Sequence, residues 1–322
     1  MVDQTIPVLD LTRFVNASEE ERAEFVAALG ESLNTLGFFA LENHGVDPAL
    51  IKRAYELCDL FFSQPTEVKE RYEFKELMGQ RGFTSFGREH AKGQPAPDLK
   101  EFWHVGREFP EKHLAADYGP NIWPLTGDCP SDFRAVFLEL YRQLEVCSVS
   151  LLQACSLYLG EVESFLPGMS ESGDTILRVI HYPPVPEERD PASVRAAAHE
   201  DINLITLLCE ATDEGLELLD RNGAWRPIRA LKGQIIVDAG DMIQNLTNGL
   251  LKSTTHRVTN PNNVKSRRFS LPFFVHPRAE ADLSPRPKCI ERTKGSAQYP
   301  EITARQFLRQ RLAEIGLDIE AA

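Results

Sequence analysis

The second half of the chain is a series of short apolar segments separated by turn residues, and this pattern constrains the fold most strongly. Asn222-Gly223, a dipeptide typical of two-residue hairpin turns, separates two of these segments. The segments predicted as strands are Thr175–His181, Ile202–Cys209, Leu216–Leu219, Trp225–Ile228, Gln234–Val237, Met242–Leu246, His256–Val258 and Arg268–Val275. Many short strands joined by turns predict a β-sandwich or a β-barrel.

The first half of the chain has helical periodicity instead. Ser18 and Glu21 have the spacing of a capping box, which predicts a helix that starts there. Asp47-Pro48 provides an N-cap and a first-turn proline for a second helix. Between Ser131 and Leu159 apolar residues recur every three or four positions, as in a long buried helix. These helices are expected to form a layer that packs on the strands.

The chain is predicted to close with a helix and to form a single domain. Thr303 is placed to cap a final helix that extends through Ile315, and Pro287–Tyr299 is expected to be a loop. We find no internal repeat and no low-complexity linker in the 322 residues. The expected architecture is therefore a mixed α/β (α+β) fold over residues 1–322.

Two histidines and one carboxylate in the strand-rich half form a candidate metal site. His199 and Asp201 are two positions apart, so on one strand both side chains point to the same side while Glu200 faces away. His256 follows Asp201 by 55 positions and is expected to come from a second strand across a barrel. Two imidazoles and a carboxylate are the facial ligand set of non-haem Fe(II) sites.

Arg268 and Ser270 form a second candidate site on the last predicted strand. They too are two positions apart and can share one strand face. A guanidinium beside a hydroxyl suits a carboxylate, which arginine binds through two parallel hydrogen bonds. A metal site and a carboxylate anchor in one predicted sheet are together stronger evidence for a functional site than either motif alone.

The order and spacing of these motifs resemble the iron(II)/2-oxoglutarate-dependent dioxygenases, in the branch that includes isopenicillin N synthase. The resemblance covers nearly the whole chain. It is carried by Ile6-Pro7-Val8-Leu9-Asp10, Gly37-Phe38-Phe39, Asn43-His44-Gly45, Tyr182-Pro183-Pro184, His199-Glu200-Asp201, Gly240-Asp241, Thr247-Asn248-Gly249, Ser253-Thr254-Thr255-His256-Arg257-Val258 and Arg268-Phe269-Ser270.

The resemblance implies a fold and a reaction. The fold is a double-stranded β-helix (jelly roll) with an N-terminal helical layer and a C-terminal helix. Residues 1–120 would form the N-terminal region of non-haem dioxygenases, and residues 175–280 the jelly-roll core that binds Fe(II) and 2-oxoglutarate. The implied reaction is oxidation of a small molecule by O2 (hydroxylation, desaturation or cyclisation), with decarboxylation of 2-oxoglutarate to succinate.

The resemblance also assigns roles to residues. His199, Asp201 and His256 would be the metal ligands and the catalytic centre, while Arg268, Ser270 and Tyr182 would bind 2-oxoglutarate. The region around Phe83, Phe102 and His104 would form the substrate side of the pocket; the alternative is that these are ordinary core residues. Asp241, after Gly240, is more simply explained by a turn between two strands. Arg178 can reach either a substrate carboxylate or an internal acid.

Two observations keep an alternative reaction open. Many relatives have a cosubstrate-facing Asn two residues before the tyrosine of the Y-P-x motif, where this chain has Ile180. A few relatives also keep the Arg-x-Ser pair and oxidise their substrate without a 2-oxo acid. The alternatives are thus a 2-oxoglutarate-independent oxidase and a non-catalytic metal-binding jelly-roll protein. A zinc hydrolase is disfavoured because an H-E-x-x-H helix is absent.

Composition limits the partners and the compartment. The net charge of −13 argues against a nucleic-acid surface, which requires a basic face. No segment has the roughly 18 apolar residues of a membrane span, and the N-terminus has no signal-peptide pattern. Six scattered cysteines without a C-x-x-C pair indicate reduced thiols. We therefore expect a cytoplasmic protein; the sequence predicts neither its prime substrate nor its oligomeric state.

Overall fold

The computed structural model describes residues 6–77, 79–89, 96–109, 118–209, 211–228 and 233–314. Its strands are β1 (Val8–Asp10), β2 (Phe38–Glu42), β3 (Gly82–Thr84), β4 (Glu101–Gly106), β5 (Ile176–Tyr182), β6 (Ala196–His199), β7 (Ile205–Cys209), β8 (Leu216–Leu219), β9 (Trp225–Pro227), β10 (Ile235–Ala239), β11 (His256–Val258) and β12 (Arg268–Val275). Its helices are α1 (Thr12–Val15), α2 (Glu19–Thr35), α3 (Pro48–Phe62), α4 (Thr66–Lys69), α6 (Phe133–Tyr158), α7 (Phe165–Ser170), α8 (Asp241–Leu246), α9 (Pro287–Arg292) and α10 (Ala304–Glu314), with 3-10 turns at Glu70–Tyr72 and Lys75–Leu77.

The strands form two sheets. The major sheet has eight strands in the order β1-β2-β10-β7-β12-β5-β4-β3, and the minor sheet has four in the order β6-β11-β8-β9. Except for β1 and β2, which run parallel, neighbouring strands are antiparallel. Sequence neighbours such as β6 and β7 lie in different sheets, as expected for a double-stranded β-helix.

The inner faces of the two sheets pack against each other. One inner cluster joins Phe102, Ile180 and Tyr182 of the major sheet to Ala196 and Val258 of the minor sheet. A second inner cluster brings the major-sheet strands β2 and β10 against β8. The jelly-roll core therefore has a shared interior, and this interior contains the candidate site.

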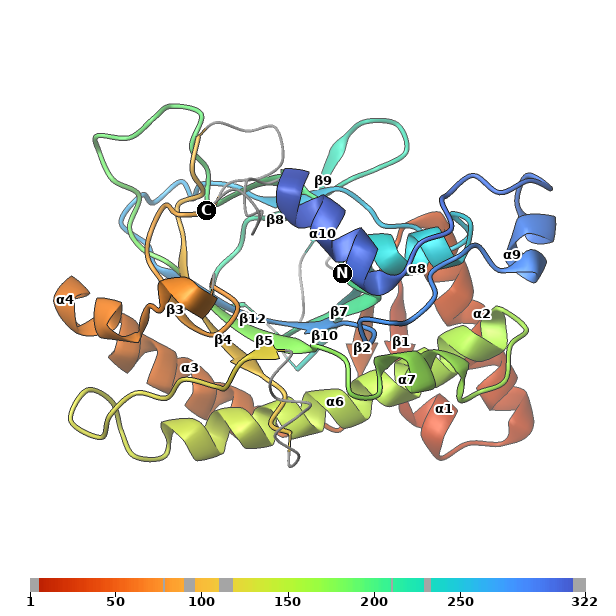
Figure 1. Cartoon of the computed structure of the whole chain (residues 1–322), viewed down its shortest axis with the longest axis horizontal. Coiled ribbons are helices and arrows are strands. Elements are labelled where there is room, and N and C mark those ends of the chain that lie inside the picture. The colour runs from red at the N-terminus through yellow and green to blue at the C-terminus, as the bar shows by residue number, and fades with distance from the viewer. Residues whose placement is uncertain are drawn as a thin grey trace.

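The outer face of the major sheet carries the helical layer. Figure 1 shows the long helix α6 along one side of the strands, with α2 and α3 on the same side. The main hydrophobic core lies between this layer and the sheet, and Leu29, Leu57, Phe137 and Trp103 are fully buried in it. The predicted α+β jelly roll with an N-terminal helical layer and a C-terminal helix is confirmed.

Local sequence signals placed the helix ends well. Ser18 and Glu21 form the predicted reciprocal capping box of α2, and the side chain of Asp47 caps α3 by accepting from the Ala49 N–H at 2.8 Å. The Thr303 N–H donates to Gln306 Oε1 at 3.0 Å at the start of α10. Among the described helices, none combines the length and the apolar character needed to cross a membrane.

Two predicted elements were wrong. Met242–Leu246 was expected to be a strand and is the helix α8, because its apolar residues face the core at helical spacing and Gly240 precedes it as an extended N-cap. The predicted loop Pro287–Tyr299 contains the helix α9, with Pro287 in its first turn. Gly240-Asp241 is accordingly the start of a helix and not a turn between two strands.

Candidate functional site

His199 and His256 are neighbours in the minor sheet. They are direct register partners in the antiparallel pairing of β6 with β11, and their ring centroids lie 4.4 Å apart. The expectation that His256 comes from across a barrel was wrong, because β11 pairs directly with β6. A register shift between His256 and Val258 lets His199 and Ala196 both lie at the interior.

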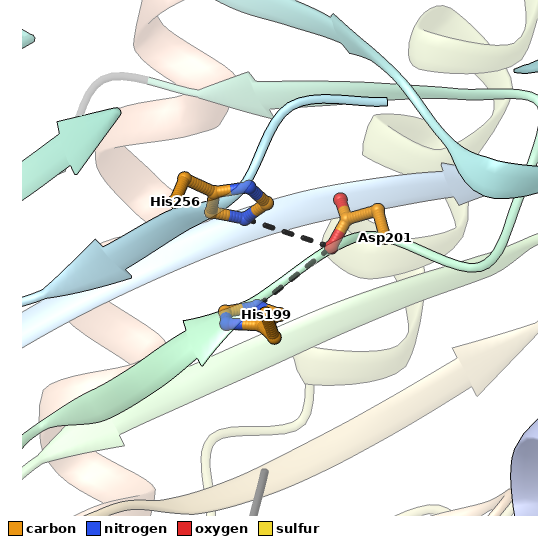
Figure 2. Close-up of side chains that lie close together, drawn as sticks. All are labelled: His199, Asp201 and His256. Atoms are coloured by element: carbon orange, nitrogen blue, oxygen red, sulfur yellow. Dashed lines mark ion pairs between the residues drawn. The ribbon is translucent and has the colours of Figure 1, made fainter. Parts of the chain in front are cut away.

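Asp201 comes from the connection between β6 and β7 and not from a strand. The predicted strand began at Ile202, but β6 ends at His199 and β7 begins at Ile205. His199 and Asp201 therefore do not share one strand, and the prediction that strand alternation directs both side chains to one side was wrong. The side chains still converge: Asp201 Oδ1 lies 3.8 Å from His199 Nε2 and 3.7 Å from His256 Nε2. Figure 2 shows both rings directed toward this one oxygen.

Hydrogen bonds orient all three side chains. His199 Nδ1 donates to the Ala197 carbonyl at 2.7 Å, and His256 Nδ1 donates to the Thr254 carbonyl at 3.1 Å. A neutral imidazole that donates from Nδ1 presents a lone pair at Nε2. Thr206 Oγ1 donates to Asp201 Oδ2, which leaves Oδ1 directed to the two rings. These contacts are the outer-shell interactions that metal ligands require.

The electrostatics of the cluster favour the neutral form of the His199 imidazole. Burial, followed by the charge of His256, lowers the pKa of His199 to about 4. Asp238, the register partner of Thr206 on β10, is a buried acid beside Asp201, and burial followed by the Asp201 charge raises the pKa of Asp238 well above its usual value.

Arg268 lies deep in the interior at the start of β12. Its side chain is 2% exposed, its Nε donates to the Asp213 carbonyl at 3.2 Å, and its Nη1 is a buried donor without a partner among the described residues. The guanidinium carbon lies 4.9 Å from the centre of the Tyr182 ring. Tyr182 on β5 is the register partner of Arg268. Ser270 is buried on the same face of β12, two positions along.

A second buried arginine, which sequence reasoning missed, supports this end of the interior. Arg195 has no exposed surface and binds Asp213 Oδ2 through Nη1 at 3.1 Å and the Ser266 carbonyl through Nη2 at 2.8 Å. Its guanidinium carbon lies 5.9 Å from the Tyr182 ring centre. Arg195 therefore fixes Asp213, whose carbonyl in turn fixes Arg268.

Phe83 does not lie with Phe102 and His104. On β4, Phe102 and His104 occupy one face, and the Phe102 ring belongs to the interior cluster. Phe83 on β3 pairs with Trp103, whose side chain faces the helical layer, and its ring packs near Phe61 at 6.0 Å. Phe83 lines a separate cavity of about 390 Å³ on the outer face of the sheet.

Besides Arg178, which the sequence analysis named, the structure brings three polar or aromatic residues to the region near His104. Arg178 of β5 pairs with His104 in register, and Phe274 of β12 lies 5.3 Å from its guanidinium carbon. His276 follows on the same side as Phe274, and Glu89 forms an ion pair with Arg178. Strand alternation was the signal available: counting in twos from Arg268 leads to Phe274 and His276.

The residue types fit a metal ion and a carboxylate ligand. Two imidazole nitrogens and one carboxylate oxygen lie within 4.8 Å of one another, a mixed N/O set that suits Fe(II). The unpartnered Nη1 of Arg268 fits an incoming carboxylate, since buried donors are normally satisfied. The two features share one interior, so a molecule anchored at Arg268 can extend toward the cluster.

Comparison with known proteins gives the same picture over most of the chain. Residues 6–126 match a family model described as the non-haem dioxygenase in morphine synthesis N-terminal region, and residues 173–277 match the 2OG-Fe(II) oxygenase superfamily. A 2-oxoglutarate-Fe(II) type oxidoreductase of Aspergillus fumigatus is 31% identical, over 84% of this chain and 82% of that protein.

Solved structures agree with the sequence comparison. A 2OG-Fe(II) oxygenase family protein from Caulobacter crescentus is 37% identical, with a TM-score of 0.85 over 97% of this chain and 99% of that chain. A full-length Neurospora crassa protein, solved in complex with alpha-KG and thymine, is 28% identical, with a TM-score of 0.85 over 96% of this chain and 97% of that chain.

Proposed function

This chain belongs to the 2OG-Fe(II) oxygenase superfamily, and we propose that His199, Asp201 and His256 hold the Fe(II) with which it oxidises a small-molecule substrate. Members of the family use Fe(II), 2-oxoglutarate and O2, so the chain is an Fe(II)- and 2-oxoglutarate-dependent oxygenase. The observation that carries the residue assignment is the convergence of two Nε2 atoms and one carboxylate oxygen within 4.8 Å.

The cosubstrate is assigned to Arg268, Ser270 and Tyr182. Arg268 offers the unpartnered Nη1 to the distal carboxylate of 2-oxoglutarate, and the Ser270 hydroxyl lies on the same strand face. Tyr182 packs against the guanidinium and closes this end of the interior. Ile180, which stands where many relatives have Asn, is buried between Phe102 and Tyr182 and contributes an apolar wall. Binding of 2-oxoglutarate at this end of the interior therefore depends on the charge interaction between Arg268 and the distal carboxylate.

The prime substrate is assigned to the interior beside Phe102 and His104. Bound iron and 2-oxoglutarate supply the oxidising chemistry, which consumes O2 and gives succinate and CO2. The protein binds and orients the substrate, excludes water and holds the ligand carboxylate through Thr206. Thymine, bound to the related Neurospora crassa protein, is one example of a small molecule held by a protein of this fold. The outcome can be hydroxylation, desaturation or cyclisation.

We further propose that residues 1–322 act as one domain. The region 1–120 supplies α2 and α3 of the helical layer and the edge strands of the major sheet, and the core 175–280 supplies the metal and cosubstrate residues. Support comes from the sheet itself, in which β2 of the N-terminal region pairs with β10 of the core. Neither region completes the major sheet without the other.

The proposal is tested by spectroscopy before any substrate is known. Fe(II) and 2-oxoglutarate are added to metal-free protein under argon, and the visible metal-to-ligand charge-transfer band is recorded. Oxygen is then admitted and succinate is measured. We expect a band in the wild-type protein, none in His256→Ala, and slow succinate formation without a prime substrate.

Two results would overturn parts of the proposal. Iron binding without a charge-transfer band would exclude the assigned cosubstrate site and favour an oxidase that needs no 2-oxo acid. An unchanged band in His256→Ala would show that the iron is held elsewhere. The serine variant Thr255→Ser provides a matched control, because Thr255 neighbours His256 but its hydroxyl binds Glu200.

A further inference from the structure

Arg195 and Arg268 are two buried arginines at the same end of the interior. Their guanidinium carbons lie 5.9 Å and 4.9 Å from the centre of the Tyr182 ring. The side chain of Arg195 has no exposed surface, and burial and the charge of Arg268 both lower the pKa of Arg195. Buried charges of the same sign repel each other, so this arrangement requires compensating acids or hydrogen bonds.

Asp213 contacts both arginines, but through different groups. Its carboxylate accepts from Arg195 Nη1 at 3.1 Å, whereas its backbone carbonyl accepts from Arg268 Nε at 3.2 Å. The carboxylate also accepts from the Ser266 hydroxyl at 3.1 Å and from the Glu214 N–H at 3.0 Å. Burial opposes the ionised form of Asp213, but the hydrogen bonds from Arg195, Glu214 and Ser266 bring its pKa below the usual value. The charge of Asp213 is therefore paired with Arg195.

Backbone contacts keep Asp213 beside Arg268 whatever the Asp213 side chain binds. The Thr212 N–H donates to the Phe269 carbonyl at 3.1 Å, and the Phe269 N–H donates to Thr212 Oγ1 at 2.9 Å. These two bonds fasten the segment that carries Asp213 to the start of β12, where Arg268 lies. The carboxyl group of an aspartate is attached close to its own carbonyl, and this carbonyl already touches Arg268 Nε. A carboxylate released from Arg195 would thus lie within reach of the Arg268 guanidinium.

We infer that Arg195 is a positioning residue of the cosubstrate site, which occupies the carboxylate of Asp213 and so keeps Arg268 Nη1 free for the distal carboxylate of 2-oxoglutarate. The inference rests on the proposed function, because it requires 2-oxoglutarate to bind at Arg268. Without Arg195, the Asp213 carboxylate pairs with Arg268, and 2-oxoglutarate has to displace it. Such an internal carboxylate competes strongly, since its attachment to the chain gives it a high effective concentration.

Titration of the charge-transfer band with 2-oxoglutarate tests this role in Fe(II)-loaded protein under argon. Arg195→Gln should raise the dissociation constant for 2-oxoglutarate roughly 10- to 150-fold, which corresponds to the loss of one charge-assisted hydrogen bond to the ligand. Adding Asp213→Asn to Arg195→Gln should recover most of the lost affinity, because the neutral amide cannot form an ion pair with Arg268. This recovery is the result that a purely structural role of Arg195 does not produce.

A matched ligand and a matched variant separate this mechanism from a general loosening of the protein. The ligand 2-oxopentanoate has the same 2-oxo acid group but no distal carboxylate, so its dissociation constant should change less than about threefold in Arg195→Gln. The control variant is Arg81→Gln. Arg81 is likewise a fully buried arginine, pairs with Asp174 at 2.6 Å and precedes the edge strand β3. Its substitution should lower the free energy of unfolding but change the dissociation constant for 2-oxoglutarate less than about twofold.

Ser266→Ala tests the same mechanism if Arg195→Gln does not fold. It removes the hydroxyl that donates to the Asp213 carboxylate and leaves Arg195 in place. The dissociation constant for 2-oxoglutarate should rise about 2- to 10-fold, as expected when one neutral hydrogen-bond donor to the competing carboxylate is lost. Adding Asp213→Asn should again recover most of the loss. Urea unfolding of the metal-free variants shows whether each of them is folded, independently of any bound ligand.

The outcomes separate this inference from the proposed function. An unchanged affinity for 2-oxoglutarate in folded Arg195→Gln, an equal loss for 2-oxopentanoate, or no recovery with Asp213→Asn would overturn the role of Arg195. Each of these results leaves the proposed function intact if the wild-type protein shows the band and Arg268→Gln weakens 2-oxoglutarate binding. Absence of the band in the wild-type protein, or an unchanged affinity in Arg268→Gln, would overturn the proposed cosubstrate site and this inference together.

Discussion

His199 and His256 lie opposite each other in the antiparallel pairing of β6 with β11, with ring centroids 4.4 Å apart. Backbone pairing thus brings two residues 57 positions apart to one place (256 − 199 = 57). The carboxylate of Asp201 completes the group from the connection between β6 and β7. This connection is tied to the start of α8, because the Asp201 carbonyl accepts from the Asp241 N–H at 2.7 Å.

Removing one imidazole should strongly weaken iron binding without unfolding the protein. His256→Ala leaves two ligands, and we expect the affinity for Fe(II) to fall by more than about 100-fold, because even outer-shell changes reduce it 10- to 100-fold. Calorimetric titration of the metal-free protein measures this. His276→Ala provides the control, since His276 is a nearby imidazole outside the cluster. Equal losses in the two variants would contradict the assigned ligand set.

Thr206 should contribute to metal affinity without touching the metal. Its hydroxyl donates to Asp201 Oδ2 and accepts from Asn203 Nδ2 at 2.9 Å. Thr206→Val keeps the shape and removes the hydrogen bond, so Fe(II) affinity should fall about 10- to 100-fold. Thr206→Ser should restore most of the loss. If Val and Ser bind iron equally well, the hydroxyl does not orient the carboxylate.

Adjacent arginines on β12 should behave differently toward 2-oxoglutarate. Arg268 faces the interior, whereas Arg267 faces the outer side and binds Asp59 at 2.6 Å and His181 at 3.0 Å. Arg268→Gln should raise the dissociation constant for 2-oxoglutarate by roughly 10- to 150-fold, as expected when one charge-assisted hydrogen bond is lost. Arg267→Gln should change it less than about twofold. Titration of the charge-transfer band distinguishes the two; similar effects would exclude Arg268 as the anchor.

Substitution of Phe83 should lower the stability of the protein, whereas substitution of Phe102 should weaken substrate binding. Phe83 is 1% exposed in the core against the helical layer, so Phe83→Ala should lower the free energy of unfolding by about 3–5 kcal/mol. It should leave substrate binding unchanged under conditions where the protein remains folded. Phe102→Ala should weaken binding of the prime substrate. Urea unfolding and calorimetry test the pair, and a substrate effect from a milder Phe83→Leu variant would contradict the orientation of β3.

His44 should make the protein less stable in mild acid. Burial lowers its pKa below the usual 6.5, and the Val46 N–H donates to its Nδ1 at 3.1 Å, so the native ring is neutral. As the pH falls below 6.5, the unfolded chain takes up a proton that the folded chain does not, and stability decreases by up to about 1.4 kcal/mol per pH unit until the native pKa is reached. His44→Gln should remove this contribution.

Urea unfolding of metal-free protein at pH 7.5 and 5.5 measures the effect. The variant is expected to be less stable than wild type at pH 7.5 but to lose less stability between the two pH values. An identical loss in both proteins would show that His44 does not contribute to the acid sensitivity.

Local sequence determined the features that need only neighbouring residues. The capping box of Ser18 and Glu21, the cap at Asp47 and the length of α6 follow from side chains within one or two helical turns. The Arg268–Ser270 pair follows from strand alternation. Two imidazoles, one carboxylate and one arginine at these positions predicted a mixed N/O metal site and a carboxylate anchor, because ligand type depends on residue identity. The reaction itself was predicted from the resemblance of the motif order to a known family.

Tertiary structure decided what those residues face. Alternation predicts that Phe83 and Phe102 each point to one side of a strand, but it does not say which side. The pairing of β3 with β4, which sets Phe83 opposite Trp103, decides that Phe83 faces the helical layer. The register that sets His256 opposite His199 and the helix at Asp241–Leu246 likewise depend on contacts between distant segments. The backbone of each strand makes side chains alternate between two faces with a period of two. Which of the two faces becomes the inner one depends on the strands and helices that pack against it, and these come from distant parts of the chain.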